Sequence, residues 1–157
     1  MFVALWTLYR VPWTRQMCNI EKRRAEQLTT RAETIASDFA RQATAVRAAE
    51  RMERCIASFP SDWQCHVLEG ALHQIAERKP AAMASYRAAL ALEERPEIYA
   101  AISILQLEQG QTEEGLRNAE KATTFNLEFA ARYEPSLRDE LWARARERER
   151  LLKAERK

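Results

Sequence analysis

Apolar residues follow the spacing of a helix face through most of the chain, and glycine or proline interrupts them at only a few points. One interruption lies in the sequence ISILQLEQGQTEEGLRNAEKA, residues 102–122, where the pattern stops at Gly110 and starts again after it. A glycine inside a helix costs about 1 kcal/mol relative to alanine. We therefore expect a turn at Gly110 between two antiparallel helices, over residues 97–109 and 112–123.

This helical hairpin is one of three similar units. The three units end at Pro60, Pro96 and Asn126. Each has a first helix with small and apolar residues, a short turn, and a second helix whose alanines share a face. Corresponding points lie 33 or 34 residues apart. Such a period is typical of a helical solenoid, because a single hairpin cannot bury its own apolar face.

These units resemble the tetratricopeptide repeat (TPR) over about residues 29–128. That repeat has a small residue in its first helix, then an alanine, a large apolar residue and a second alanine in its second helix. The matching positions are Ala36, Ala48, Met52 and Cys55, then Gly70, Ala82, Tyr86 and Ala89, then Ser103, Gly115, Ala119 and Ala122. Small residues there let two helices approach closely. The resemblance implies an all-α fold, a right-handed superhelix of helix pairs.

The two ends depart from the repeat, as terminal segments of a solenoid do. The chain divides into an apolar segment at 1–13, a basic helical connector at 14–28, three repeats at 29–128, and capping helices with a charged tail at 129–157. A thin apolar stripe on the last helix favours a capping role, with docking to a partner or an anionic surface as the alternative. The stripe consists of Leu137, Leu141, Ala145 and Leu152.

Composition agrees with a helical protein and excludes one class of partner. Of 157 residues, 46% are hydrophobic, and only 3 are glycine and 5 proline. The net charge is +2, and the basic residues gather toward the two ends around an acidic body. A nucleic-acid-binding protein needs a continuous basic face, so we expect no nucleic acid partner.

The first 13 residues, MFVALWTLYRVPW, are the most apolar stretch. A helix of that length reaches only about 20 Å, short of a hydrocarbon core of about 30 Å. Three interpretations stay open: an interfacial membrane anchor, the end of a longer span, or a strap packed on the protein. Aromatic residues at helical spacing favour a membrane or an apolar partner surface. These residues are Phe2, Trp6, Tyr9 and Trp13.

No residue pattern indicates catalysis or a cofactor. The glycines do not have the spacing of a phosphate-binding loop, and His66 and His73 would lie about 10 Å apart along one helix. Cys65 beside His66 lacks the further ligands of a zinc motif. We therefore expect no enzymatic activity, no cofactor and no metal site.

Cys55 and Cys65 lie five residues to either side of Pro60, in the loop between two antiparallel helices. Because both lie the same number of residues from the loop, the two helices should bring them opposite one another. They therefore form a candidate disulfide, with two buried free cysteines as the alternative. A disulfide would indicate an oxidising compartment, whereas the basic residues after position 13 favour the cytoplasmic side if residues 1–13 belong to a span. Cys18, in the connector, is expected to stay free and reactive.

The resemblance to TPR arrays implies a concave groove built from the first helix of each repeat. The groove residues would be Glu33, Ser37, Val67, Ala71, Gln74, Ala100, Ile104 and Leu107. They lack the lysine–asparagine clamp that holds a terminal carboxylate in some TPR proteins. An apolar helix or extended segment suits this groove better.

We therefore expect a non-enzymatic protein-interaction scaffold associated with a membrane through its N-terminus. The alternative is an accessory or assembly subunit packed permanently in a larger membrane protein complex. Two of the four tryptophans lie in the first 13 residues, which fits this alternative.

Overall fold

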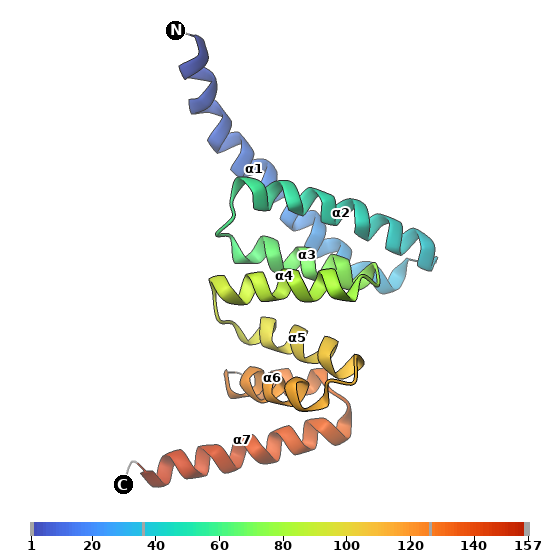
Figure 1. The fold of residues 1–157 in the computed structure, drawn as a ribbon, viewed down its shortest axis with the longest axis vertical. Coiled ribbons are helices and arrows are strands. Elements are labelled where there is room, and N and C mark those ends of the chain that lie inside the picture. The colour runs from blue at the N-terminus through green and yellow to red at the C-terminus, as the bar shows by residue number, and fades with distance from the viewer. Residues whose placement is uncertain (1, 36, 126, 156–157) are drawn as a thin grey trace. The chain divides into compact units, whose positions relative to one another are not determined.

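Figure 1 shows the computed structural model of the chain, which describes residues 2–35, 37–125 and 127–155. Side chains are described from residue 15 onward, except at 33, 125, 127, 145, 148, 149, 151–153 and 155. All secondary structure in the described residues is helical, with no strand among them, which confirms the predicted all-α fold. The chain divides into two compact units, Met1–Leu92 and Glu93–Lys157.

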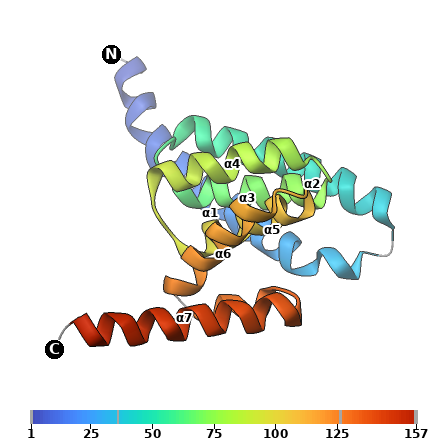
Figure 2. The same ribbon diagram turned by 60° about the horizontal axis from the view of Figure 1, so that its bottom comes forward.

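The first unit begins with the longest helix. Its elements are α1 (Phe2–Arg31), the short 3-10 helix η1 (Ala32–Thr34), α2 (Asp38–Ser58), α3 (Trp63–Ile75) and α4 (Lys79–Leu92). Helices α3 and α4 run antiparallel and lie side by side in both Figure 1 and Figure 2. Helix α1 packs against both α2 and α3.

The second unit repeats the hairpin arrangement and adds a long last helix. Its elements are α5 (Pro96–Glu108), α6 (Thr112–Phe125), the 3-10 helix η2 (Leu127–Arg132) and α7 (Pro135–Glu155). Helices α5 and α6 form the antiparallel pair, and α7 packs against α6 and η2. The turn between α5 and α6 lies where the sequence predicts it, with Gly110 at φ +75°, a left-handed conformation that favours glycine.

Local signals place the helix starts. The side-chain oxygen of Ser37 accepts a hydrogen bond from the Ala40 N–H at the start of α2, and that of Asp62 accepts one from the Gln64 N–H at the start of α3. Both are typical N-caps. Pro96 occupies the first turn of α5, where its missing N–H has no intrahelical partner to lose.

Small residues lie where the two helices of each hairpin approach most closely. A Cβ atom at Gly70 would lie 2.7 Å from the Tyr86 ring on α4, and one at Gly115 would lie 2.8 Å from Cγ of Leu107 on α5. The alanines of the second helices are fully buried: Ala82, Ala89, Ala119 and Ala122. The small residues at these positions therefore have the packing role that the resemblance to TPR arrays implies.

Each unit has its own apolar core. In the first unit Met52 of α2, Cys65 of α3 and Leu72 of α3 are fully buried in one cluster. In the second unit Leu141 of α7 is buried against Ala119 and Tyr133, and Leu137 packs beside them. Helix α7 therefore closes the core of the second unit, as a capping helix does. Ala145 and Leu152, also predicted for this stripe, have side chains outside the described residues.

The first predicted repeat has a different construction from the one expected. Its small position, Ala36, lies outside the described residues, and Glu33 belongs to η1 rather than to a first helix. Residues 38–58 form a single helix of 21 residues, because they contain neither glycine nor proline. Helix α2 therefore packs against α1, and α1 takes the place of the expected first helix.

Helix α1 begins at Phe2 and continues through the predicted connector. No helix in the described part of the chain combines the length and the apolar character that a membrane span requires. Phe2, Trp6, Tyr9 and Trp13 all belong to α1, but their side chains lie outside those that the structure describes. Their predicted contact with lipid or a partner stays a prediction.

Candidate functional site

The predicted groove residues of the middle hairpin share one side of α3. Val67, Ala71 and Gln74 are spaced four and three residues apart, so they follow one face of the helix. All three side chains are partly exposed. The Gln74 side-chain oxygen accepts a hydrogen bond from the Tyr86 hydroxyl at 3.2 Å, which fixes one end of this face against α4. The result is a short, largely uncharged surface at the first helix of the hairpin.

The corresponding residues of α5 are more deeply packed. Ala100 is fully buried in the second unit and cannot contact a partner, so its assignment to the groove is wrong. It is buried because α5 inserts much of its surface into the core, with Ile98, Ile102 and Leu105 also buried. Ile104 and Leu107 are partly exposed and pack beside the α6–α7 core.

The two groove residues predicted on the first repeat lie in the link between α1 and α2. Ser37 is the exposed N-cap of α2, so its hydroxyl is already used by the Ala40 N–H. The side chain of Glu33 lies outside the described residues. Of the eight predicted groove residues, Ser37 is exposed, and Val67, Ala71, Gln74, Ile104 and Leu107 are partly exposed.

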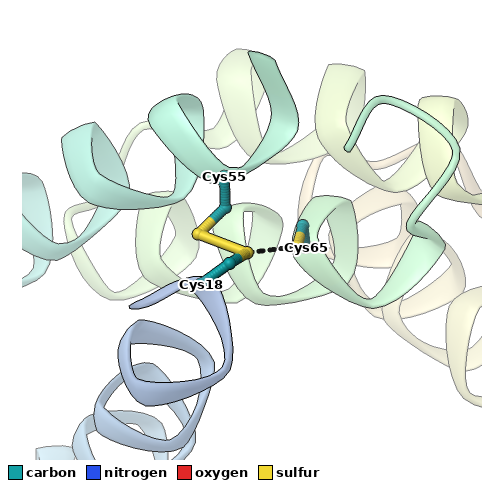
Figure 3. A group of neighbouring side chains, drawn as sticks. All are labelled: Cys18, Cys55 and Cys65. Atoms are coloured by element: carbon teal, nitrogen blue, oxygen red, sulfur yellow. Dashed lines mark hydrogen bonds between the residues drawn. A yellow bond between two sulfur atoms is a disulfide. The ribbon is translucent and has the colours of Figure 1, made fainter. Parts of the chain in front are cut away.

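A second feature joins three helices of the first unit at one buried point. Cys18 of α1, Cys55 of α2 and Cys65 of α3 converge there, as Figure 3 shows. Their exposed fractions are 3%, 5% and 0%, and their sulfur atoms all lie within 4.8 Å of one another. The cluster contains all three cysteines of the chain.

The disulfide in this cluster is not the predicted one. It joins Cys18 to Cys55, with 5.3 Å between their Cα atoms, and Cys65 is the free thiol. The expectation of a Cys55–Cys65 pair considered only the α2–α3 hairpin, whereas α1 packs on both helices and brings Cys18 to the sulfur of Cys55. The expectation that Cys18 stays free and reactive is wrong for the same reason.

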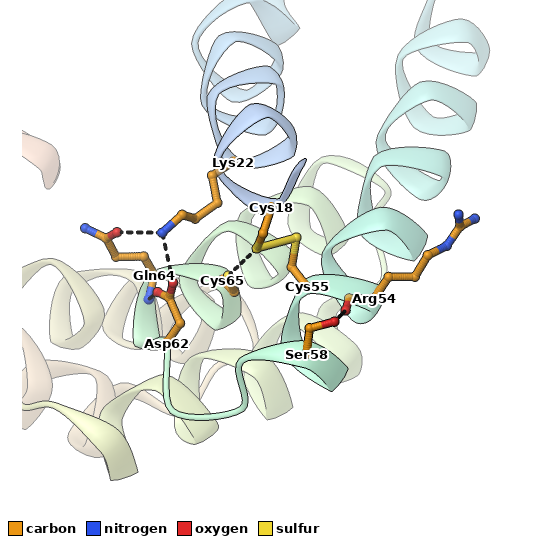
Figure 4. The surroundings of a disulfide bond; sticks show 8 residues. All are labelled: Cys18, Lys22, Arg54, Cys55, Ser58, Asp62, Gln64 and Cys65. Carbon is orange, nitrogen blue, oxygen red and sulfur yellow. Dashed lines mark hydrogen bonds and ion pairs between the residues drawn. A yellow bond between two sulfur atoms is a disulfide. The ribbon is translucent and has the colours of Figure 1, made fainter. Parts of the chain in front are cut away.

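An ion pair between Lys22 and Asp62 lies beside the free thiol, as Figure 4 shows. The Lys22 ammonium donates to the Asp62 carboxylate at 2.9 Å and to the Gln64 side-chain oxygen at 3.1 Å. Burial, reinforced by the negative charge of Asp62, raises the pKa of Cys65 to about 12. Beside an intact disulfide, Cys65 is therefore a protonated and unreactive thiol at neutral pH.

Burial alone would raise the pKa of Asp62, but the hydrogen bond and charge of Lys22 outweigh it and hold that pKa below its ordinary value. The histidines do not add to this site. His66 contacts the Pro60 carbonyl oxygen at 3.2 Å, and His73 is buried elsewhere on α3. Among the described residues, the three cysteines are the group whose donor atoms converge as metal ligands do.

No protein-family model matches this chain, and no curated protein matches it. A solved structure that it resembles is TTC0263, a thermophilic TPR protein in Thermus thermophilus, with a TM-score of 0.61 and 23% sequence identity. The match covers 77% of this chain and 59% of that one, so this chain spans less than two thirds of its neighbour. The likeness shows a TPR-like helical fold, in agreement with the resemblance found in the sequence.

Proposed function

Starting from this TPR-like fold, we propose that the protein is a non-enzymatic interaction scaffold that binds a protein segment on the first-helix face of its hairpins. The observation that carries the proposal is the partly exposed row on α3. Val67, Ala71 and Gln74 present two apolar side chains and an amide without a charged group among them. Such a surface suits an apolar helix or an extended segment.

Ile104 and Leu107 extend the proposal to α5. Both are partly exposed, and they occupy the same repeat positions as Ala71 and Gln74. The proposed binding residues are therefore Val67, Ala71 and Gln74 in the first unit and Ile104 and Leu107 in the second.

Site-specific photo-cross-linking in the cells that make the protein tests this proposal. A photoreactive amino acid at Val67 should form a covalent adduct with a partner, and one at Ile104 tests the corresponding face of α5 in the second unit. The same probe at Ala84, which is exposed on α4, or at Arg117, which is exposed on α6, is the matched control and should not capture it. Equal capture from the control positions, or none from Val67 and Ile104, would show that the first-helix face is not the binding surface.

We propose further that residues 1–13 hold the scaffold at a membrane surface. The support comes from the sequence: an apolar stretch whose aromatic residues recur at helical spacing. The oxidation state of the cysteines would indicate the side of the membrane on which the protein lies. A Cys18–Cys55 disulfide that persists in the protein as isolated would favour an oxidising compartment, and fully reduced cysteines would favour the cytoplasmic side.

A further inference from the structure

The three cysteines have an arrangement that a structural disulfide does not require. A disulfide needs two cysteines, and a third buried sulfur beside it contributes nothing to that bond. Here the Cys65 sulfur lies 3.7 Å from the Cys18 sulfur, at the centre of the α1, α2 and α3 packing. Two kinds of chemistry use three sulfurs together: exchange of disulfide partners, and coordination of a metal ion.

Geometry distinguishes these two kinds of chemistry. In an exchange, the Cys65 sulfur would attack Cys18 nearly in line with the bond to Cys55. The Cys65 sulfur lies 3.7 Å from the Cys18 sulfur, and no two of the three sulfurs are more than 4.8 Å apart. The sulfurs therefore form a triangle and not a line, which is the arrangement of ligands around a shared ion.

We propose that in the reduced chain Cys18, Cys55 and Cys65 bind one Cu⁺ ion through three thiolates, each thiol releasing its proton to the solvent as it binds the ion. A soft, thiolate-rich site favours Cu⁺ or Zn²⁺, but structural Zn²⁺ almost always has four ligands. Among the described residues the three sulfurs are the donor atoms that lie within 4.8 Å of one another, and the nearby Asp62 carboxylate is paired with the Lys22 ammonium at 2.9 Å. Cu⁺ accepts three thiolates without a fourth ligand.

The distances fit this ion with small movements. Metal–sulfur bonds of about 2.3 Å place three sulfurs at the corners of a triangle with edges of about 4 Å. The Cys18–Cys65 edge is 3.7 Å already, and the Cα atoms of Cys18 and Cys55, 5.3 Å apart, allow their sulfurs to separate by side-chain rotation once the disulfide is reduced. The disulfide and the metal site use the same two sulfurs, so they are alternative states.

A pocket of about 200 Å³ gives the ion a path to the cluster. It opens on Cys18 and Cys55 and is lined by the thioether of Met17, which is 37% exposed, and by Arg51 and Arg54. Cu⁺ with three thiolates carries two net negative charges, and the cations of this region are Arg51 and Arg54, which line the pocket, and Lys22 on α1. Glu21, which also lines the pocket, is paired with Arg51 and Arg24.

The sequence did not indicate this site because its ligands have no motif spacing. Cys18 and Cys55 are 37 residues apart, and Cys65 follows Cys55 on the next helix. The bound ion would join α1, α2 and α3 at one point, whereas the disulfide joins only α1 and α2. Binding should therefore stabilise the first unit as well as report on the thiols.

The test is titration of the full chain, reduced with a phosphine in the absence of oxygen, with Cu⁺ supplied by the chromogenic chelator bathocuproine disulfonate. The natural chain should take one Cu⁺, and copper absorption spectroscopy should show three sulfur ligands. Cys65→Ser is the decisive variant, because it leaves the Cys18–Cys55 pair intact. It should bind Cu⁺ at least about 100-fold more weakly than the natural chain. Removing a residue that only supports a metal ligand costs up to about 100-fold in affinity, and removing a ligand itself should cost at least as much.

Controls separate loss of the ligand from loss of the fold. Cys65→Ala replaces Cys65→Ser if serine disturbs the core. Both variants must keep the helical circular dichroism signal. Both must also form the Cys18–Cys55 disulfide on oxidation, which mass spectrometry detects as the loss of two hydrogens. The oxidised natural chain should bind no Cu⁺. Unchanged affinity in both Cys65 variants, or Cu⁺ bound by the oxidised chain as tightly as by the reduced one, would overturn the three-thiolate site.

Discussion

A single methyl group added at Gly70 should separate α3 from α4, because this glycine lies against the ring of Tyr86. A Cβ atom there would lie 2.7 Å from Cε1 and 2.8 Å from Cδ1 of that ring. Non-bonded carbon atoms prefer about 3.5–4.0 Å, so the ring would have to retreat by roughly 1 Å. Tyr86 is only 3% exposed, and its hydroxyl donates to Gln74, so the retreat strains a packed and hydrogen-bonded side chain.

The sign of the effect should depend on Tyr86. Overpacking a buried contact costs about 1–3 kcal/mol, whereas glycine to alanine within a helix gains about 1 kcal/mol by itself. Gly70→Ala should therefore lower the free energy of unfolding by about 1 kcal/mol in the natural chain. In a Tyr86→Leu chain the ring is absent, and the same substitution should raise that free energy by about 1 kcal/mol.

Urea unfolding of the four chains, followed by far-ultraviolet circular dichroism, measures an expected coupling of about 2 kcal/mol. Gly110→Ala is the matched control. Gly110 has a φ of +75° and nothing within 4 Å of its Cβ position, so alanine there should cost about 1–2 kcal/mol in either Tyr86 background. If Gly70→Ala has the same effect with and without the Tyr86 ring, the close approach of α3 and α4 is refuted.

Three further predictions concern the first unit. Reducing the Cys18–Cys55 disulfide without adding metal should lower the urea-unfolding free energy by roughly 4 kcal/mol, from the chain-entropy model at a separation of 37 residues. Asp62→Asn keeps the helix cap but removes the charge paired with Lys22. This substitution should lower the free energy of unfolding by about 0.5–1 kcal/mol at neutral pH. It should also reduce the loss of stability on acidification. The depressed pKa of Asp62 contributes stability above about pH 4, and the natural chain loses this contribution as the pH falls through the folded-state pKa of Asp62. Deleting residues 2–13 should move the protein from the membrane fraction to the soluble fraction and lower its helical signal only by the deleted part of α1; unchanged fractionation would contradict a membrane anchor.

The hairpins could be predicted from the sequence because their determinants are local. Gly110 forms the left-handed turn between α5 and α6. A small residue at position 70 lets α3 and α4 pack closely, and one at position 115 does the same for α5 and α6. These features depend on residues within one repeat. The α5–α6 boundaries accordingly agree with the prediction within two residues, at Glu108, Thr112 and Phe125.

The pairing of the cysteines and the exposure of the groove residues depend on contacts between helices that the spacing of the repeats does not specify. Equal distances from Pro60 say nothing of the rotation of each helix, and Cys55 turns toward α1, a helix that the hairpin argument left out. Ala100 has a groove position in the repeat, yet α5 buries it because its neighbours on the helix are also apolar. Repeat position predicts where a side chain points, and the packing of the whole unit decides whether it is exposed.

The measurement that tests the central claim most directly is the affinity of the cross-linked partner segment, made as a peptide, for two charge variants of the scaffold. Val67→Asp places a carboxylate on the α3 face, and Ala84→Asp places the same group on the exposed side of α4. With both variants shown to be folded by their unfolding curves, Val67→Asp should bind at least about tenfold more weakly, a loss of about 1.4 kcal/mol, while Ala84→Asp binds as the natural chain does. Equal affinity of the two variants would contradict binding on the first-helix face.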